Sequence, residues 1–154
     1  ENKLEQLPFM EDELILIAHP NHPLALKEQV FLADLKGQPL VMREATSGTR
    51  LVLSQRLEEK GFSWDELEIV MELGSTRAVI TAVEAGVGLS WVSRWSVKDA
   101  LQLGNVVEIP VEDFVIQRPL YLAYNNRRTL SPLALAFKEF LLDREKHQAI
   151  LEQK

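Results

Sequence analysis

Two short turns rich in hydroxyl groups hold the residues best suited to bind a small anion. The first is Thr46-Ser47-Gly48-Thr49, flanked by Arg43 and Arg50, and the second is Gly74-Ser75-Thr76-Arg77. Each turn follows an apolar run and precedes residues that are apolar at helical spacing, so each is expected to open a helix. Backbone N–H groups are free at a helix N-terminus, where the helix dipole favours negative charge. The pattern therefore predicts an anion-binding turn.

The hydroxyl residues also have a purely structural interpretation. Ser47 and Ser75 stand where helix N-caps are expected, and Thr49 stands in a first helical turn. Ser and Thr are favoured there because their side-chain oxygens accept hydrogen bonds from free backbone N–H groups. Ligand binding and capping therefore remain two readings of the same residues.

The arginines are equally open to two interpretations. Arg50 either neutralises an anionic ligand or forms a surface ion pair with Glu44 or Glu58. Arg77 stands where the helix dipole repels a cation. Its presence indicates either an anion nearby or an exposed side chain that reaches Glu72.

The residues typical of catalytic and metal sites do not form a convincing set. His19 and His22 are each followed by proline, which is more typical of a rigid loop than of a metal site. No third metal ligand stands near them in the sequence. No serine is placed as a nucleophile relative to a histidine. The sequence has no cysteine, which excludes disulfides and thiolate zinc sites. We therefore expect no catalytic residue, no metal and no cofactor, and a protein that is not an enzyme.

Composition narrows the possible partners. The chain has 154 residues, and its 23 acidic residues outnumber its 17 Lys and Arg residues, giving a net charge of −6. Because no basic face is evident, we do not expect this chain to bind nucleic acid by itself. No apolar run is long enough to span a membrane, and the first residues do not form a signal peptide. A cytoplasmic location fits these features.

Apolar runs and helical patterns alternate along the chain. Strands are expected at residues 14–18, 39–42, 67–73, 87–92, 106–109 and 119–124, and helices at residues 31–37, 51–60, 76–85, 94–103 and from residue 132. Residues 1–10 are polar and expected to be irregular. The alternation predicts an α/β fold with a largely parallel sheet. In such sheets ligands bind beyond the carboxyl ends of the strands, where both hydroxyl-rich turns are expected.

Several segments occur in an order that resembles a known family. They are the run 14–18, His22-Pro23-Leu24-Ala25, Arg43-Glu44, Ser47-Gly48-Thr49-Arg50, Ala85-Gly86-Val87-Gly88-Leu89 and Pro119-Leu120-Tyr121. This succession resembles the effector-binding domain of LysR-type transcriptional regulators, over nearly the whole chain. The resemblance implies an α/β fold like that of type 2 periplasmic binding proteins, in which two Rossmann-like lobes are joined by two crossing strands and a ligand binds in the cleft.

The resemblance also implies a division of the chain. Residues 1–19 are the end of the first lobe and a crossing strand, residues 20–118 are a complete second lobe, and residues 119–154 are the returning crossing strand and the last helix of the first lobe. The strand-helix-strand unit that opens the family's first lobe is missing, as are the winged helix-turn-helix and the linker helix. The first lobe is therefore expected to be incomplete, and the chain to be an N-terminally truncated fragment.

Function follows from the same resemblance. Ser47, Gly48 and Thr49 match positions that often donate hydrogen bonds to the effector in this family. Together with Arg50, Ser75, Thr76 and Arg77 they form the expected site for a small anionic metabolite. The family pairs its regulatory domains, so a homo-oligomer is expected, and DNA is contacted only through the winged helix-turn-helix.

An alternative is a solute-binding lobe of a transport system, for which a signal peptide upstream of Glu1 would be the mark. A catalyst of the porphobilinogen-deaminase type shares the architecture but needs a cofactor-bearing cysteine, which this sequence lacks.

Overall fold

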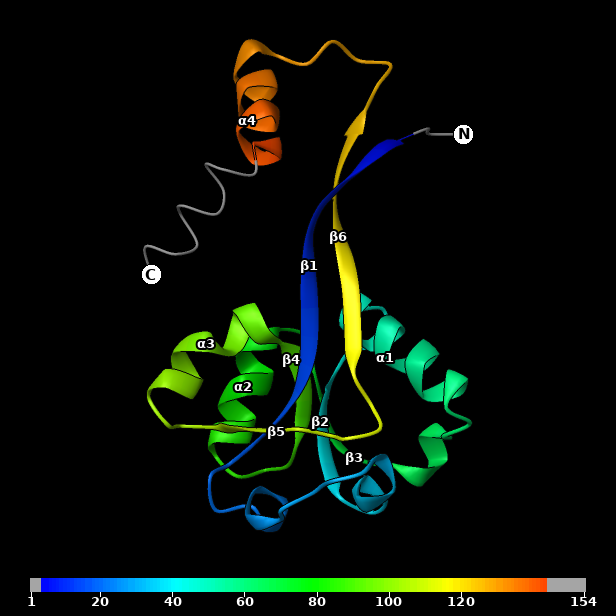
Figure 1. Cartoon of the computed structure of the whole chain (residues 1–154), viewed down its shortest axis with the longest axis vertical. Coiled ribbons are helices and arrows are strands. Elements are labelled where there is room, and N and C mark those ends of the chain that lie inside the picture. The colour runs from blue at the N-terminus through cyan, green and yellow to red at the C-terminus, as the bar shows by residue number, and fades with distance from the viewer. Residues whose placement is uncertain (1–3, 144–154) are drawn as a thin grey trace. The chain divides into compact units, whose positions relative to one another are not determined.

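The computed structural model describes residues 4–143, and the chain divides into two compact units. Unit 1 contains both ends of the chain, up to Glu11 and from Pro119 onwards, and unit 2 is Asp12–Arg118. Two long strands, β1 (Leu4–Ala18) and β6 (Ile116–Asn125), contribute residues to both units and pair with each other (Figure 1).

The centre of unit 2 is a mixed sheet. Strand β1 runs antiparallel to β4 (Ser90–Ser93) on one side and to β5 (Val107–Ile109) on the other. Strand β2 (Pro39–Arg43) runs parallel to β3 (Glu68–Leu73). A parallel bridge between Leu40 and Leu89, just before β4, joins β2 to the rest.

The predicted α/β fold is confirmed, but the prediction of a largely parallel sheet holds for only part of it. The β2–β3 ladder and the bridge from β2 to Leu89 are parallel, as expected for strands joined by crossover helices. Strand β1 is the exception, since it runs antiparallel to both β4 and β5. This strand belongs to no β-α-β crossover, so the rule that makes crossover strands parallel does not fix its direction.

Helices cover both faces of this sheet. In Figure 1, α1 (Gly48–Glu59) lies on one side, and α2 (Thr76–Glu84) and α3 (Arg94–Gln102) lie on the other. Alternate residues of β1 divide between two cores: Leu14 and Leu16 pack with α1, whereas Ile15 and Ile17 pack with α2 and α3. Because side chains alternate across a strand, an uninterrupted apolar run is what a strand covered on both faces requires.

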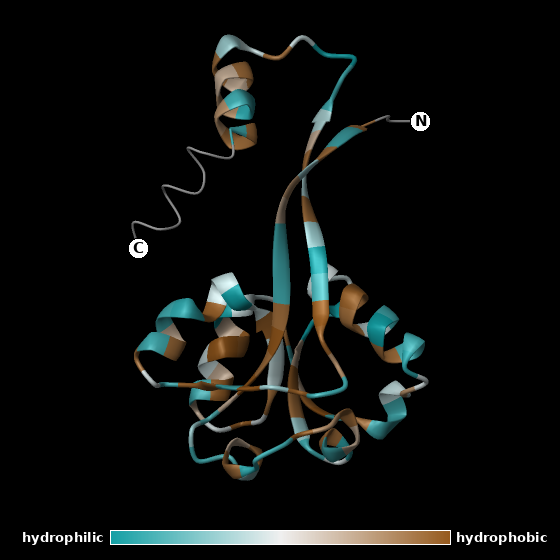
Figure 2. Ribbon diagram, viewed as in Figure 1, coloured by the Kyte–Doolittle hydropathy of each residue, from teal (hydrophilic) through white to brown (hydrophobic). Residues whose placement is uncertain are grey.

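The colours of Figure 2 follow the same arrangement. Hydrophobic residues gather on the strands in the middle of unit 2, and hydrophilic residues lie on outward helical turns. The predicted helix ends are also present: Gly61, Gly86 and Gly104 follow α1, α2 and α3 with φ values of 68°, 76° and 71°. Glycine adopts this left-handed conformation without the steric cost that other residues incur.

Some boundaries differ from the predictions. Strand β1 begins at Leu4, so the expectation of an irregular segment before residue 11 is wrong for the described residues, because pairing with β6 satisfies the backbone there. The helix expected at residues 31–37 is a single 3₁₀ turn, Leu32–Leu35, and further 3₁₀ turns lie at Pro23–Leu26 and Trp64–Glu66.

Helix α4 (Pro132–Leu142) belongs to unit 1 and begins as predicted. Its N-cap is Ser131, whose hydroxyl accepts a hydrogen bond from the Ala134 N–H, and proline follows at the first helical position. The charged tail after it, with His147, lies outside the described residues. Among the helices of residues 4–143, none is long and apolar enough to span a membrane.

The two histidines of the 19–23 loop act as acceptors for neighbouring backbone groups. His19 Nδ1 accepts from the Asn21 N–H at 3.1 Å, and His22 Nδ1 accepts from the Leu24 N–H at 3.2 Å, capping a 3₁₀ turn. Partial burial lowers the pKa of His22 below 6.5, because desolvation disfavours the charged imidazolium.

This loop predicts a pH effect on stability. Because the pKa of His22 is lower in the folded chain than in the unfolded chain, the folded chain binds fewer protons. The contribution of the neutral imidazole to stability is therefore fully present above pH 6.5 and is lost as the pH falls below that value. His22→Asn keeps an oxygen acceptor for the cap but does not titrate. We expect thermal unfolding of this variant to lose part of the dependence on pH between neutral and mildly acidic solution. Equal pH dependence in both proteins would contradict this.

Gly88 makes a second prediction. A Cβ atom at this position would lie 2.4 Å from the Pro39 carbonyl oxygen, inside the bridge that joins β2 to β4. Gly88→Ala is therefore expected to lower the free energy of unfolding by about 1–3 kcal/mol, the usual cost of overpacking a core. The matched control is Gly48→Ala, because nothing lies within 4 Å of a Cβ there. Denaturant unfolding that ranks the control as the more damaging change would contradict the packing argument.

Candidate functional site

The two hydroxyl-rich turns lie side by side at one edge of the sheet. The ladder between β2 and β3 ends with Arg43 opposite Leu73, and the Glu44 N–H donates to the Leu73 carbonyl at 3.3 Å. Because both strands are parallel, their carboxyl ends deliver the start of α1 and the start of α2 to the same place. This is the arrangement in which α/β sheets bind ligands.

Both predicted N-caps are present. The Ser47 hydroxyl accepts from the Arg50 N–H, and the Ser75 hydroxyl accepts from the Ala78 N–H, each at 3.1 Å. Ser47 is buried, whereas Ser75 is exposed. Each cap uses a lone pair of the oxygen and leaves the O–H hydrogen available. Capping therefore does not exclude ligand binding by the same hydroxyl.

The threonines of the two turns are each held by an arginine. Thr76 Oγ1 accepts from Arg43 Nη1 at 2.8 Å, and Thr49 Oγ1 accepts from Arg118 Nη1 at 3.3 Å. A guanidinium group has donors and no acceptor, so the hydroxyl hydrogen points elsewhere. Within the described part of the chain, no acceptor takes the hydrogen of either threonine. Both hydroxyls are therefore prepared to donate to a ligand.

The arginines around the site are paired with carboxylates. Arg43 makes two hydrogen bonds of 2.8 Å to Glu44, which lower the pKa of that carboxyl and raise the pKa of the guanidinium. Arg118 forms an ion pair with Asp12 at 2.7 Å. With Arg50 also paired, positive charge at this edge is largely compensated, so the attraction for an anion comes from N–H and O–H dipoles.

Arg50 forms an ion pair, but not with either partner named from the sequence. Its Nη1 donates to Glu72 at 2.8 Å and to the Arg43 carbonyl at 2.9 Å. Its guanidinium carbon also lies 4.8 Å from the centroid of the Trp64 ring, a cation–π distance. The expected surface partners Glu44 and Glu58 are wrong, because Glu44 is bound to Arg43 and the neighbouring strand brings Glu72 closer.

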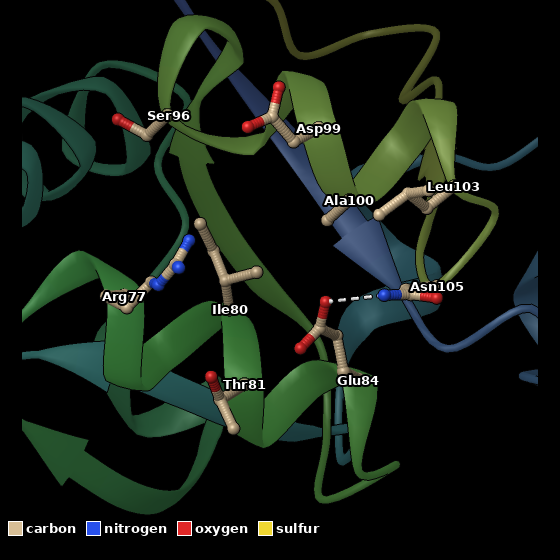
Figure 3. A pocket seen from close by; sticks show the side chains of 9 residues that line it. All are labelled: Arg77, Ile80, Thr81, Glu84, Ser96, Asp99, Ala100, Leu103 and Asn105. Atoms are coloured by element: carbon tan, nitrogen blue, oxygen red, sulfur yellow. Dashed lines mark hydrogen bonds between the residues drawn. The ribbon is translucent and has the colours of Figure 1, made fainter.

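Arg77 lies in a different place from the other predicted residues. Figure 3 shows it at the rim of a pocket between α2 and α3, of about 360 Å³, which also holds Glu84 and Asp99. Glu84 accepts a hydrogen bond of 3.2 Å from Asn105 in this pocket. The suggested contact of Arg77 with Glu72 is absent from the described residues, since Glu72 binds Arg50. Although Arg77 and Thr76 are adjacent in sequence, the Thr76 hydroxyl lies against Arg43, whereas Arg77 lines the pocket between α2 and α3.

Sequence reasoning missed three residues next to the first turn. Asp12, Ser93 and Arg118 are far apart along the chain, yet Asp12 accepts from Ser93 Oγ at 2.7 Å and from Arg118 Nε at 2.8 Å. The available signal was an acidic residue, Asp12, two positions before an uninterrupted buried strand. Buried carboxylates need partners, but sequence does not say which basic residue supplies one.

Comparison with known proteins gives the family. The LysR substrate binding domain model matches residues 1–146. The chain belongs to this family. The RuBisCO operon transcriptional regulator of Allochromatium vinosum is 38% identical over 140 residues, which are 91% of this chain and 45% of that protein. The chain thus spans about half the length of the curated relatives it matches, and these relatives are transcriptional regulators rather than transport proteins.

Solved structures of LysR-type regulatory domains share the fold. The Synechocystis CcmR regulatory domain in complex with 2-PG has a TM-score of 0.81 and 28% identity, covering 92% of this chain and 67% of that one. The effector-binding domain of QuiR in complex with shikimate has a TM-score of 0.80 and 26% identity, covering 96% and 68%. The predicted LysR-type effector-binding fold, like that of type 2 periplasmic binding proteins, is confirmed.

In this LysR substrate-binding domain, replacing Ser93 is expected to cost more stability than replacing Ser75. Ser93→Ala leaves Oδ1 of the buried Asp12 without its donor, which is expected to cost about 1–3 kcal/mol of unfolding free energy. Ser75→Ala is the matched control, because it removes an exposed cap worth about 1 kcal/mol. Urea denaturation measures both. If Ser93→Ala lowered the unfolding free energy less than Ser75→Ala, the hydrogen bond from Ser93 to the buried Asp12 would not contribute the stability predicted for it.

Proposed function

We propose that this chain binds a small anionic metabolite at the paired turns of α1 and α2 and serves as the effector sensor of a DNA-binding transcription regulator. The observation that carries the proposal is the meeting of two helix N-termini and their hydroxyl groups at one edge of the sheet. Helix N-termini with free N–H groups and O–H donors are suited to carboxylate and phosphate oxygens.

Within this site, we assign contact with the effector to Ser47, Gly48, Thr49, Ser75 and Thr76. Gly48 is exposed and nothing lies within 4 Å of the position its Cβ would occupy, so a ligand oxygen has room to approach the backbone. The hydroxyls of the two threonines are free to donate, as described above.

The two predicted arginines receive different roles. Arg50 is held by Glu72 and Trp64 and fixes the turn around it, while its charge still contributes to the field at the site. Arg77 faces the pocket between α2 and α3, so we no longer assign it a contact with the effector (Figure 3).

The neighbours support an anionic ligand. The two structures most useful for comparison were solved with 2-PG and with shikimate, both small anions. The proposal carries the class of ligand to this chain, not either compound. It also retains the expected lobes: residues 20–118 as the second lobe, with residues 1–19 and 119–154 supplying crossing strands and the last helix of the first.

Other features of the proposal concern the whole protein. We expect DNA to be bound by another part of the regulator, because a net charge of −6 does not favour contact with phosphates. A cytoplasmic location and the absence of catalysis follow from the same role. Self-association is supported by α4, where Leu133 is 80% exposed and Phe137 is 58% exposed.

The test is a ligand panel with matched variants. Small carboxylates and phosphates, including 2-PG and shikimate, are screened for a rise in the melting temperature of the chain, and hits are measured by calorimetry. Thr49→Val and Thr76→Val are each expected to weaken binding by about tenfold or more, because each removes a hydrogen bond to a charged group.

Thr81→Val is the control for these variants. Thr81 lies on α2 and is exposed, but it lines the pocket that contains Arg77 (Figure 3). The affinity of the Thr81→Val variant for a ligand from the panel is expected to equal that of the unmodified chain. Failure of every compound to shift the melting temperature would go against the proposed function. A loss of binding in Thr81→Val comparable to that in Thr76→Val would indicate that the ligand binds in the pocket between α2 and α3 and not at the paired turns.

A further inference from the structure

Asp12 is a buried carboxylate with an unusually complete set of partners. The residue is 3% exposed. Its Oδ1 accepts from Ser93 Oγ at 2.7 Å, and its Oδ2 accepts from Arg118 Nε at 2.8 Å and lies 2.7 Å from Arg118 Nη2. Such a group is costly to desolvate unless it is both paired and hydrogen-bonded. The interactions around Asp12 meet both requirements.

Ser93 donates to Asp12 instead of capping a helix. It is the N-cap residue of α3, yet its side chain makes no capping hydrogen bond. The N-cap serines of α1, α2 and α4, by contrast, all accept from a backbone N–H. The hydroxyl of Ser93 is committed to Asp12, so α3 forgoes a cap that normally contributes about 1 kcal/mol.

Arg118 extends this set of bonds to the proposed effector site. While Nε and Nη2 face Asp12, Nη1 donates to Thr49 Oγ1 at 3.3 Å. Thr49 stands in the first turn of α1. The planar guanidinium fixes the directions of its N–H groups, so a side chain locked onto Asp12 presents Nη1 in a defined direction.

We propose that Arg118 is a positioning residue for the effector site. It holds the Thr49 hydroxyl so that its hydrogen faces away from the guanidinium and towards the ligand, and Asp12 and Ser93 hold Arg118 in place. This inference rests on the proposed function of the α1 turn. It adds a rule of specificity: the ligand atom that meets Thr49 is an acceptor oxygen, because a hydroxyl oxygen that already accepts from Arg118 offers its hydrogen and leaves a ligand N–H donor without a partner.

A double-variant cycle tests the contact without any ligand. Arg118→Lys keeps a positive charge for Asp12 but lacks the second arm that reaches Thr49. In the unmodified background, Thr49→Val is expected to raise the unfolding equilibrium constant about fivefold, the effect of one lost hydrogen bond. In the Arg118→Lys background the same change is expected to have almost no effect. An equal fold-change in both backgrounds, measured by urea denaturation, overturns the positioning contact.

Binding of 2-PG provides the second readout. Arg118→Lys is expected to weaken 2-PG binding by about tenfold, and adding Thr49→Val to it is expected to weaken binding little further. Arg56→Lys is the control, because Arg56 forms an exposed ion pair with Glu59 on the same helix. A purely structural Arg118 would lower the melting temperature and leave affinity intact, which would overturn the inference.

The two proposals fail in different ways. If the unmodified chain binds no member of the anion panel, the proposed function fails, while the denaturation cycle still decides whether Arg118 holds Thr49. If the chain binds 2-PG and the variants at 49 and 118 weaken it independently, the function stands and the positioning role is wrong.

Discussion

The buried ion pair between Asp12 and Arg118 is the contact on which the organisation of unit 2 depends. These residues are the first and the last of that unit, so the pair joins the point where the chain enters to the point where it leaves. Its partners come from the sheet, from the start of α3 and from the start of α1. Removing one member would leave a desolvated charge without compensation, which typically costs several kcal/mol.

The same contact explains how the first turn acquires a defined geometry. A helix N-terminus offers an anion a favourable dipole, but a threonine hydroxyl beside it rotates freely unless something fixes it. Arg118 provides this constraint for Thr49, and Arg43 provides it for Thr76. In both cases the arginine is itself held by a carboxylate. In the proposed effector site, the arginines therefore orient donor groups more than they supply net charge.

This division of roles has an electrostatic consequence. Because Arg43, Arg50 and Arg118 are each paired with an acidic residue, the attraction that the proposed site offers to an anion comes mainly from dipoles within contact distance. Interactions of that kind depend on close fit and are screened less by salt than long-range attraction is. A site of this type selects ligands by the positions of their oxygen atoms, which suits a family whose members bind different small molecules.

The sequence by itself determined most of the helices and strands and the two turns. An apolar run before a hydroxyl, and a glycine after helical spacing, identify a strand, an N-cap and a helix end through local geometry, which is why Ser47, Ser75 and Gly86 were placed correctly. The parallel β2 and β3 then followed from their alternation with helices.

Tertiary structure alone decided the direction of β1, the partner of Arg50 and the group formed by Asp12, Ser93 and Arg118. Ion pairs and strand directions that join distant segments leave no periodic signal, because any of several carboxylates satisfies an arginine equally well until the sheet selects one.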